Sequence, residues 1–208
     1  NGNPYRGAHI FAISASEAYD TSKEVVRDFL HARSEKEIIY TRNTSESLNL
    51  VARSYGETHL KKGDHILITI AEHHSNLVTW QRVAEKTGAI LDYMYVDKET
   101  GHFPEEELKK IDDPRVKLFA FAEVSNVLGI DFDPKPLIQR AHAHGAIVVL
   151  DGAQSTPHKK VDVQDLDCDF FAFSGHKMCS MGGIGVLYGK EELLNDMEPF
   201  LMGGDMIE

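Results

Sequence analysis

The sequence predicts an α/β fold of three layers, in which helices cover both faces of a mainly parallel, mixed sheet. The main observation is an alternation along the chain. Apolar segments of strand length are separated by segments whose apolar residues recur at helical spacing. Since parallel strands are joined by crossovers that usually contain a helix, this alternation favours a parallel sheet buried on both faces. The length of 208 residues suffices for one domain with a substantial core.

Seven short segments are expected to form the strands of this sheet. Several are continuous apolar runs, as in residues 146–150, which read Ala-Ile-Val-Val-Leu. Turn residues punctuate the chain between them, for example Gly63 before the second segment. The expected strands are residues 37–40, 65–70, 90–96, 116–122, 146–150, 170–173 and 184–188.

Five segments are expected to be helical. The second of them begins after Asn43, and Glu46 follows three residues later, which is the spacing of a capping box. Pro104 precedes the fourth segment, where proline is favoured in the first turn. The expected helices span residues 15–32, 44–55, 72–84, 105–111 and 134–144.

The composition argues against several classes of protein. The formal net charge of −11 disfavours nucleic-acid binding, because phosphate recognition needs a basic face. No apolar segment reaches membrane-spanning length and the first residues lack a signal-peptide pattern, so we expect no membrane association. Cys168 and Cys179 are too few for a disulfide framework and suit a reducing compartment, which predicts a cytoplasmic protein.

The chemistry is expected to centre on two residues that follow buried strands. Asp151 follows residues 146–150, and open α/β sheets bind ligands at the carboxyl ends of their strands. Lys177 follows residues 170–173, where desolvation would lower the pKa of its amine and let it attack a carbonyl. Taken singly, such a lysine is more often a surface residue and such an aspartate a cap or loop residue. Together they fit a pyridoxal phosphate enzyme, which needs a lysine for a Schiff base and an acid beside the ring nitrogen.

Two other segments are weaker candidates. Residues 42–45 open a helix and carry hydroxyl groups, and free N–H groups there favour a phosphate, although most helix starts bind nothing. His73 and His74 are adjacent, so their side chains diverge, and no nearby carboxylate or thiol completes a zinc ligand set. We therefore expect no metal site, and a histidine ring that stacks on a flat cofactor. The glycines of residues 182–185 precede a strand, which is the wrong context for a dinucleotide fingerprint.

Five segments carry a family resemblance. They are residues 41–46 (Thr-Arg-Asn-Thr-Ser-Glu), 72–76 (Glu-His-His-Ser-Asn), 124–129 (Val-Ser-Asn-Val-Leu-Gly), 151–154 (Asp-Gly-Ala-Gln) and 174–177 (Ser-Gly-His-Lys). In order and spacing, the chain resembles the cysteine desulfurase and selenocysteine lyase family, a class V aminotransferase-like group of pyridoxal phosphate enzymes of fold type I. The resemblance implies that residues 1–208 are a cofactor-binding large domain. It also implies truncation at both ends, with an N-terminal segment and a C-terminal small domain missing.

The resemblance implies a role for each matching residue. Lys177 would bind the aldehyde of pyridoxal phosphate and carry the substrate's Cα proton, and Asp151 would pair with the pyridinium nitrogen. His73 would stack on the ring and assist proton transfer, and Gln154 would bind the phenolic oxygen. Asn126 would lie near the substrate carboxylate. The phosphate would be held by residues at the start of one helix and the end of one strand, namely Thr44, Ser45, Ser174 and His176.

The implied reaction removes sulfur from L-cysteine, or selenium from L-selenocysteine, and leaves alanine. The sulfur would pass as an enzyme persulfide to an acceptor protein, for iron–sulfur cluster assembly or sulfur transfer. Cys168 and Cys179 do not match the persulfide position, so the expected cysteine, and the arginine that grips the substrate carboxylate, would lie beyond Glu208. Family members are homodimers, which predicts self-association, and we expect this fragment to be inactive by itself.

The loop after Lys177 departs from the family pattern. Residues 180–183 read Ser-Met-Gly-Gly where the family usually has Gly-Pro-Thr-Gly, and without the proline the loop is looser, which affects any dimer contact it makes. Two alternative functions stay open. One is another class V aminotransferase or lyase that acts on a different amino acid, and the other is a non-catalytic scaffold with the same fold.

Overall fold

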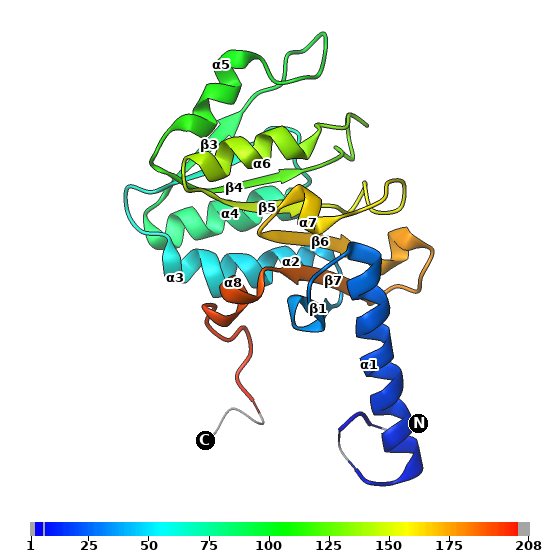
Figure 1. Ribbon diagram of the computed structural model, residues 1–208. Helices are drawn as coiled ribbons and strands as arrows, with labels where there is room; N and C mark the ends of the chain where they lie inside the picture. The colour runs from blue at the N-terminus through cyan, green and yellow to red at the C-terminus, as the bar shows by residue number, and fades with distance from the viewer. Residues whose placement is uncertain (1–2, 6, 204–208) are drawn as a thin grey trace.

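The computed structural model describes residues 3–5 and 7–203 and confirms the predicted α/β fold, with a seven-stranded mixed sheet between helices (Figure 1). The expected points of truncation, Asn1 and Glu208, lie outside the described residues. The strands are β1 (Ile38–Thr41), β2 (His65–Thr69), β3 (Ile90–Met94), β4 (Val116–Ala122), β5 (Ile147–Asp151), β6 (Phe170–Ser174) and β7 (Gly185–Gly189).

The strand order across the sheet is β1-β7-β6-β5-β4-β2-β3. The five strands from β3 to β6 are parallel to one another, and their pairing places Ala122 of β4 opposite Asp151 of β5. β7 is antiparallel to both of its neighbours, and its first residue, Gly185, pairs with Ser174 on one side and Thr41 on the other. The carboxyl ends of β1, β2, β4, β5 and β6 therefore reach the same edge of the sheet.

Helices cover both faces, as the alternation of the sequence predicts. One face is packed by α2 (Thr44–Val51) and α4 (His74–Thr87), and the other by α6 (Pro134–Ala143), α7 (Val163–Leu166) and the carboxyl end of α1 (Ile10–Leu30). The first half of α1 projects away from the sheet (Figure 1). The shorter elements are α3 (Glu57–His59), α5 (Glu105–Leu108), α8 (Glu191–Asn195), the 3-10 turns η1 (Glu35–Glu37), η3 (Lys109–Asp112) and η4 (Gly175–Met178), and the π-helix η2 (Ala52–Gly56).

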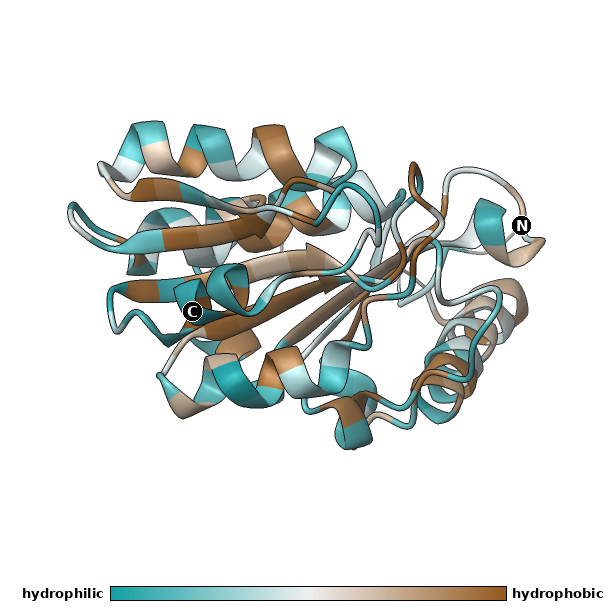
Figure 2. Cartoon of the chain, turned by 90° about the horizontal axis from the view of Figure 1, so that it is seen from above, coloured by the Kyte–Doolittle hydropathy of each residue, from teal (hydrophilic) through white to brown (hydrophobic). Residues whose placement is uncertain are grey.

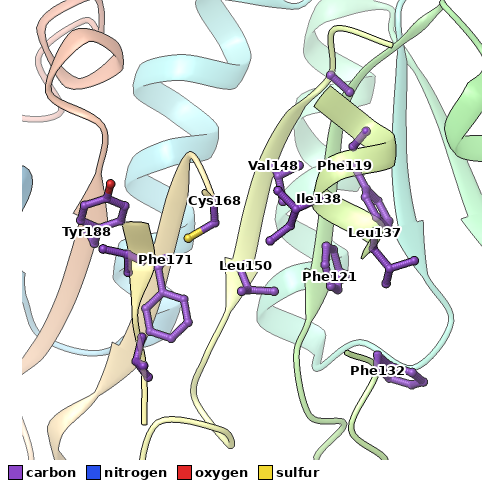
Figure 3. Packing of buried hydrophobic residues seen from close by; sticks show 14 of the residues in the cluster. Phe119, Phe121, Phe132, Leu137, Ile138, Val148, Leu150, Cys168, Phe171 and Tyr188 are labelled. Atoms are coloured by element: carbon purple, nitrogen blue, oxygen red, sulfur yellow. The ribbon is translucent and has the colours of Figure 1, made fainter. Parts of the chain in front are cut away.

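The core has two parts because successive side chains of a strand point to opposite faces. On one face, Phe119 and Val148 pack beside Leu137 and Ile138 of α6, and Phe171 belongs to the same cluster on the side of Cys168 and Tyr188 (Figure 3). Leu118 and Val149 point the other way, against α2 and α4. Figure 2 shows the resulting apolar strands between helices with hydrophilic outer surfaces. Burying these residues is the main stabilising contribution, at roughly 25 cal/mol per Å² of apolar surface.

Sequence-based boundaries differ from the observed ones mainly at helix ends. α1 begins at Ile10, five residues before the expected start at residue 15, and His9 is its N-cap. The Asn43 side chain accepts the Glu46 N–H, as expected, but the Glu46 carboxylate accepts the N–H of Arg42 and not that of Asn43, so the capping box is shifted by one residue. Among the described residues, no helix is both long enough and apolar enough to cross a bilayer.

Candidate functional site

A pocket of about 240 Å³ opens at the edge of the sheet where the parallel strands end. Its lining comes from segments spread over the sequence, namely the start of α2, the turn before α4, the turns after β4 and β5, and η4. The structure brings all nine site residues expected from the sequence together on this pocket. They are Thr44, Ser45, His73, Asn126, Asp151, Gln154, Ser174, His176 and Lys177.

Gly185 allows the start of α2 to reach the end of β6. A Cβ atom on Gly185 would lie 2.6–2.8 Å from the backbone atoms of Asn43, so only glycine permits this close approach. Asn43 is the N-cap of α2, and the next residue, Thr44, donates its N–H to the Ser174 hydroxyl at 2.8 Å. The first N–H groups of a helix have no acceptor within the helix, so this corner of the pocket suits an anion.

Asp151 ends β5 with its carboxyl group on the pocket. The side chain is buried, with 4% of the residue exposed, and Ala153 N–H, at 2.9 Å from Oδ1, is its only described hydrogen-bond donor. Burial raises the pKa of Asp151, while the Ala153 N–H and the nearby Lys177 and His73 act in the opposite direction. A buried carboxylate with a single donor binds a cationic or protonated ligand atom strongly, because such a ligand restores the lost solvation.

Lys177 and His176 lie on η4, directly after β6. The sequence places Lys177 between two buried strands, which predicts a buried side chain. In the structure the side chain is half-buried, so its desolvation is only partial. The turn is anchored by two backbone hydrogen bonds, from Gly175 N–H to the Ile184 carbonyl at 2.8 Å and from Ser180 N–H to the Gly175 carbonyl at 3.0 Å. Lys177 therefore lines the pocket from the turn after β6, the strand that pairs with β5, which ends in Asp151. The charge of Lys177 lowers the pKa of Asp151.

His73 has a second function that the sequence does not make obvious, since it caps α4. Its Nδ1 accepts the N–H of Ser75 at 3.2 Å and lies 2.8 Å from the Ser75 hydroxyl. With Nδ1 as the acceptor, the neutral ring carries its proton on Nε2. The exposed ring forms a wall of the pocket in a defined orientation, which suits a flat ligand. An N-cap pattern, His followed two residues later by Ser, is the signal in the sequence.

Asn126 and Gln154 complete the wall from the turns after β4 and β5. The turn of Asn126 is tied to the turn after β2, because the Ser125 hydroxyl donates to the Ala71 carbonyl at 3.0 Å. The turn of Gln154 folds over the Gly152 carbonyl, which accepts the Thr156 N–H at 3.0 Å. Both amide side chains are therefore available as ligands for polar groups.

Glu72 is included in the segment 72–76 in the sequence analysis but is assigned no role of its own there. It lies between β2 and His73, is buried with 7% exposed, and accepts three hydrogen bonds. An acid shortly after a buried strand was the available signal, since Glu72 follows the end of β2 by three residues.

Known proteins place the chain in a family. The aminotransferase class-V family model matches residues 1–208. The chain belongs to the class V aminotransferase family. This confirms the resemblance that the five sequence segments indicate, and the class V aminotransferases to which the chain is similar form a pyridoxal-phosphate-dependent group.

Curated relatives of this class V aminotransferase chain bear the name cysteine desulfurase. A probable cysteine desulfurase of Halalkalibacterium halodurans is 50% identical over 208 residues, which are 100% of this chain and 51% of that protein. A cysteine desulfurase of Synechococcus elongatus is 48% identical over 207 residues, 100% of this chain and 33% of that protein. The chain spans about half the length of the first relative and about a third of the length of the second.

Solved structures agree with the family. The cysteine desulfurase CsdA of Escherichia coli superposes with a TM-score of 0.88 at 42% identity, over 100% of this chain and 52% of that one. The apo cysteine desulfurase of Thermococcus onnurineus superposes with a TM-score of 0.93 at 44% identity, over 100% and 51%. The fold is therefore that of the fold-type I pyridoxal phosphate enzymes.

The residues present fit pyridoxal phosphate. An amine for the aldehyde (Lys177), a buried acid for the ring nitrogen (Asp151) and an exposed flat ring (His73) line one pocket, together with hydroxyl groups and a helix start for the phosphate. Each chemical group of the cofactor has a complementary group in this donor set.

Proposed function

We propose that this chain is the cofactor-binding large domain of a pyridoxal-phosphate-dependent cysteine desulfurase. Such an enzyme removes sulfur from L-cysteine and leaves alanine and an enzyme persulfide. The observation that carries the proposal is the placement of Asp151 and Lys177 at the ends of adjacent strands, β5 and β6, on one pocket. Support for the substrate comes from the relatives and solved structures named as cysteine desulfurases.

The residues of the pocket divide the work of holding the cofactor. Thr44, Ser45, Ser174 and His176 would hold the phosphate, and Gln154 would bind the phenolic oxygen. Asp151 would pair with the ring nitrogen and keep it protonated, because a desolvated carboxylate with a raised pKa binds a proton-bearing partner strongly. The ring of His73 would stack on the flat ring of the cofactor. Bound in this way, pyridoxal phosphate supplies an electron sink for the negative charge that develops at the substrate's Cα.

Two side chains act on protons and covalent bonds. Lys177 would hold the cofactor through its amine, and its free amine would serve as the base that takes up the substrate's Cα proton. His73 has its proton on Nε2, because Nδ1 is occupied by Ser75, and it assists this transfer. Asn126, which also lines the pocket, would orient the substrate carboxylate.

The thiol that receives the sulfur is proposed to lie outside residues 1–208. Cys168 is fully buried at the start of β6, and burial raises the pKa of its thiol, which opposes formation of a thiolate. Cys179 is exposed at the end of η4 but does not line the pocket. A partly exposed thiolate is needed for the nucleophilic step, so neither cysteine suits it.

We further propose that the complete enzyme is a cytoplasmic homodimer that accepts L-cysteine or L-selenocysteine and passes sulfur to an acceptor protein for iron–sulfur cluster assembly. Support for self-association comes from α1, where the apolar side chains of Ile10, Phe11 and Val25 are 72%, 65% and 63% exposed, because exposed apolar side chains on a helix favour contact with another chain. Support for cysteine binding comes from a solved structure with a TM-score of 0.85 at 28% identity, described as SspA in complex with cysteine.

Titration with pyridoxal phosphate tests the cofactor site directly. We expect the chain to acquire a visible absorbance that differs from that of the free cofactor, Lys177→Ala to abolish it, and Lys160→Ala, a change of an exposed lysine outside the pocket, to retain it. A wild-type chain that takes up no cofactor, or equal spectra for both variants, would contradict the proposal.

Turnover requires a protein of the relatives' full length that contains this chain. We expect it to release alanine and to transfer sulfur when given L-cysteine with a thiol reductant, and to lose both products in Lys177→Ala. Amino-group transfer to a keto acid without sulfide would indicate the alternative aminotransferase. Cofactor binding without turnover of any amino acid would indicate the non-catalytic scaffold.

A further inference from the structure

Glu72 is a buried acid behind the pocket wall that the proposed chemistry does not use. Its Oε1 accepts hydrogen bonds from the Thr69 hydroxyl group and from Ala122 N–H, the latter at 3.1 Å, and its Oε2 accepts one from Asn76 Nδ2 at 2.6 Å. The three donors belong to β2, β4 and α4. One carboxyl group therefore joins two strand ends to the first turn of a helix.

The hydrogen-bonded chain continues to an indole. Asn76 Oδ1 accepts the Nε1–H of Trp80 at 2.8 Å, and this bond orients the amide so that its NH₂ group faces Glu72. Trp80 is fully buried and is the single tryptophan of the sequence. The chain Glu72–Asn76–Trp80 is thus isolated from solvent and has a spectroscopic reporter at its end.

Glu72 also lies close to the acid of the pocket. Ala122, whose N–H binds Glu72, is the partner of Asp151 in the pairing of β4 with β5, so Glu72 and Asp151 are both neighbours of the same residue. The pKa of Glu72 is raised to about 8, because burial and, to a smaller extent, the charge of Asp151 raise it by more than its three hydrogen bonds lower it. The three hydrogen-bond donors, Thr69, Ala122 and Asn76, are neutral. Among the described residues, Asp151 is the charged group that changes the pKa of Glu72.

We propose that Glu72 is a positioning residue of the pocket, whose carboxyl group fixes the segment that presents His73 and whose negative charge, when Glu72 is ionised, opposes the ionisation of Asp151. The positioning follows from the chain, since Glu72 directly precedes His73 and is held at three points. The electrostatic effect follows from reciprocity: if Asp151 opposes ionisation of Glu72, ionised Glu72 opposes ionisation of Asp151 by the same free energy.

The effect of Glu72 on ligand binding by Asp151 rests on the proposed function. The measurement that tests the coupling between Glu72 and Asp151 does not. With Glu72 ionised, Asp151 binds a proton, or a protonated ligand atom such as a ring nitrogen, more strongly. The coupling itself is a property of the protein without any cofactor. If the chain binds no pyridoxal phosphate, the proposed function is wrong. The coupling between Glu72 and Asp151 is then still tested by the pH titration of the cofactor-free chain.

The measurement is the emission of Trp80 during a pH titration of the cofactor-free chain. We expect one transition with a midpoint at about pH 8, because ionisation of Glu72 places a charge at the end of the chain that binds the indole. Glu72→Gln should lose this transition. Glu123→Gln should retain it, since Glu123 is a buried acid next to Ala122 that pairs with Lys159 and makes no bond to Asn76 or Trp80.

Asp151→Asn tests the coupling. Removing the charge that raises the pKa of Glu72 should shift the midpoint of the Trp80 transition to lower pH. This variant keeps Glu72 and decides the question even if Glu72→Gln does not fold, which circular dichroism would show. A flat wild-type titration, a transition that persists in folded Glu72→Gln, or an unchanged midpoint in Asp151→Asn would overturn the proposal.

Discussion

The Ser174 hydroxyl group accepts the N–H of Thr44 at 2.8 Å and lies 2.6 Å from the Thr44 hydroxyl group. Ser174 ends β6 and Thr44 begins α2, so this contact joins two segments that are 130 residues apart in the sequence. Both residues are buried, at 3% and 5% exposed. The contact closes one wall of the pocket and holds the start of α2 beside η4, which carries Lys177.

Replacing Ser174 with alanine tests the contribution of this contact to stability. We expect Ser174→Ala to lower the free energy of unfolding by about 1–3 kcal/mol, because the buried Thr44 N–H and hydroxyl group lose a partner. Ser180→Ala, at an exposed serine of the following loop, should change it by less than about 0.5 kcal/mol. Urea unfolding of both variants gives the comparison, and equal midpoints would contradict the expectation.

Gly185 is expected to tolerate no side chain. Gly185→Ala places a Cβ atom 2.6–2.8 Å from the Asn43 backbone, so β7 or the start of α2 must shift. The expected loss of stability is about 1–3 kcal/mol, the range typical of overpacking. Gly182→Ala is the matched control, because a Cβ atom there meets open space. Thermal unfolding distinguishes them, and a Gly185→Ala midpoint as high as that of the control would refute the steric argument.

The ionisation of Glu72 predicts a specific pH dependence of stability. The pKa of Glu72 rises from 4.5 to about 8 on folding, so the native chain binds a proton more tightly than the unfolded chain does. The contribution of Glu72 to stability is therefore fully present below pH 4.5 and is lost as the pH rises to about 8.

Glu72→Gln lacks this titration. The free energy of unfolding of Glu72→Gln relative to wild type should rise between pH 4.5 and about 8 and stay constant at higher pH. Urea unfolding at a series of pH values measures this difference for both chains. A difference that is independent of pH would show that Glu72 does not change its proton affinity on folding.

The two cysteines are expected to react differently with a thiol reagent. Cys179 is exposed and should be modified rapidly in the native chain. Cys168 is buried, and burial raises the pKa of its thiol, so it should react only after unfolding. Labelling before and after addition of urea, with the masses of the modified peptides, assigns each thiol. Modification of Cys168 under native conditions would contradict the observed core.

Local features of the sequence predicted most of the secondary structure and two residues, Asp151 and Lys177, that line the candidate pocket. The strand over residues 116–122 is observed without change, as Val116–Ala122, and the other strands differ by at most two residues at either end. Burial and side-chain period are short-range properties, so apolar runs identify strands before their partners are known. Asp151 and Lys177 were recognisable for the same reason, since each follows such a run.

Only the tertiary structure decided how these segments meet. The insertion of antiparallel β7 between β1 and β6 brings Thr44 to Ser174, and no local pattern specifies that pairing. The burial of Glu72, and with it the coupling to Asp151, depends on β4 lying between β2 and β5. Strand order and the field inside a protein result from contacts between residues far apart in the chain, so their physical cause exists only after the chain has folded.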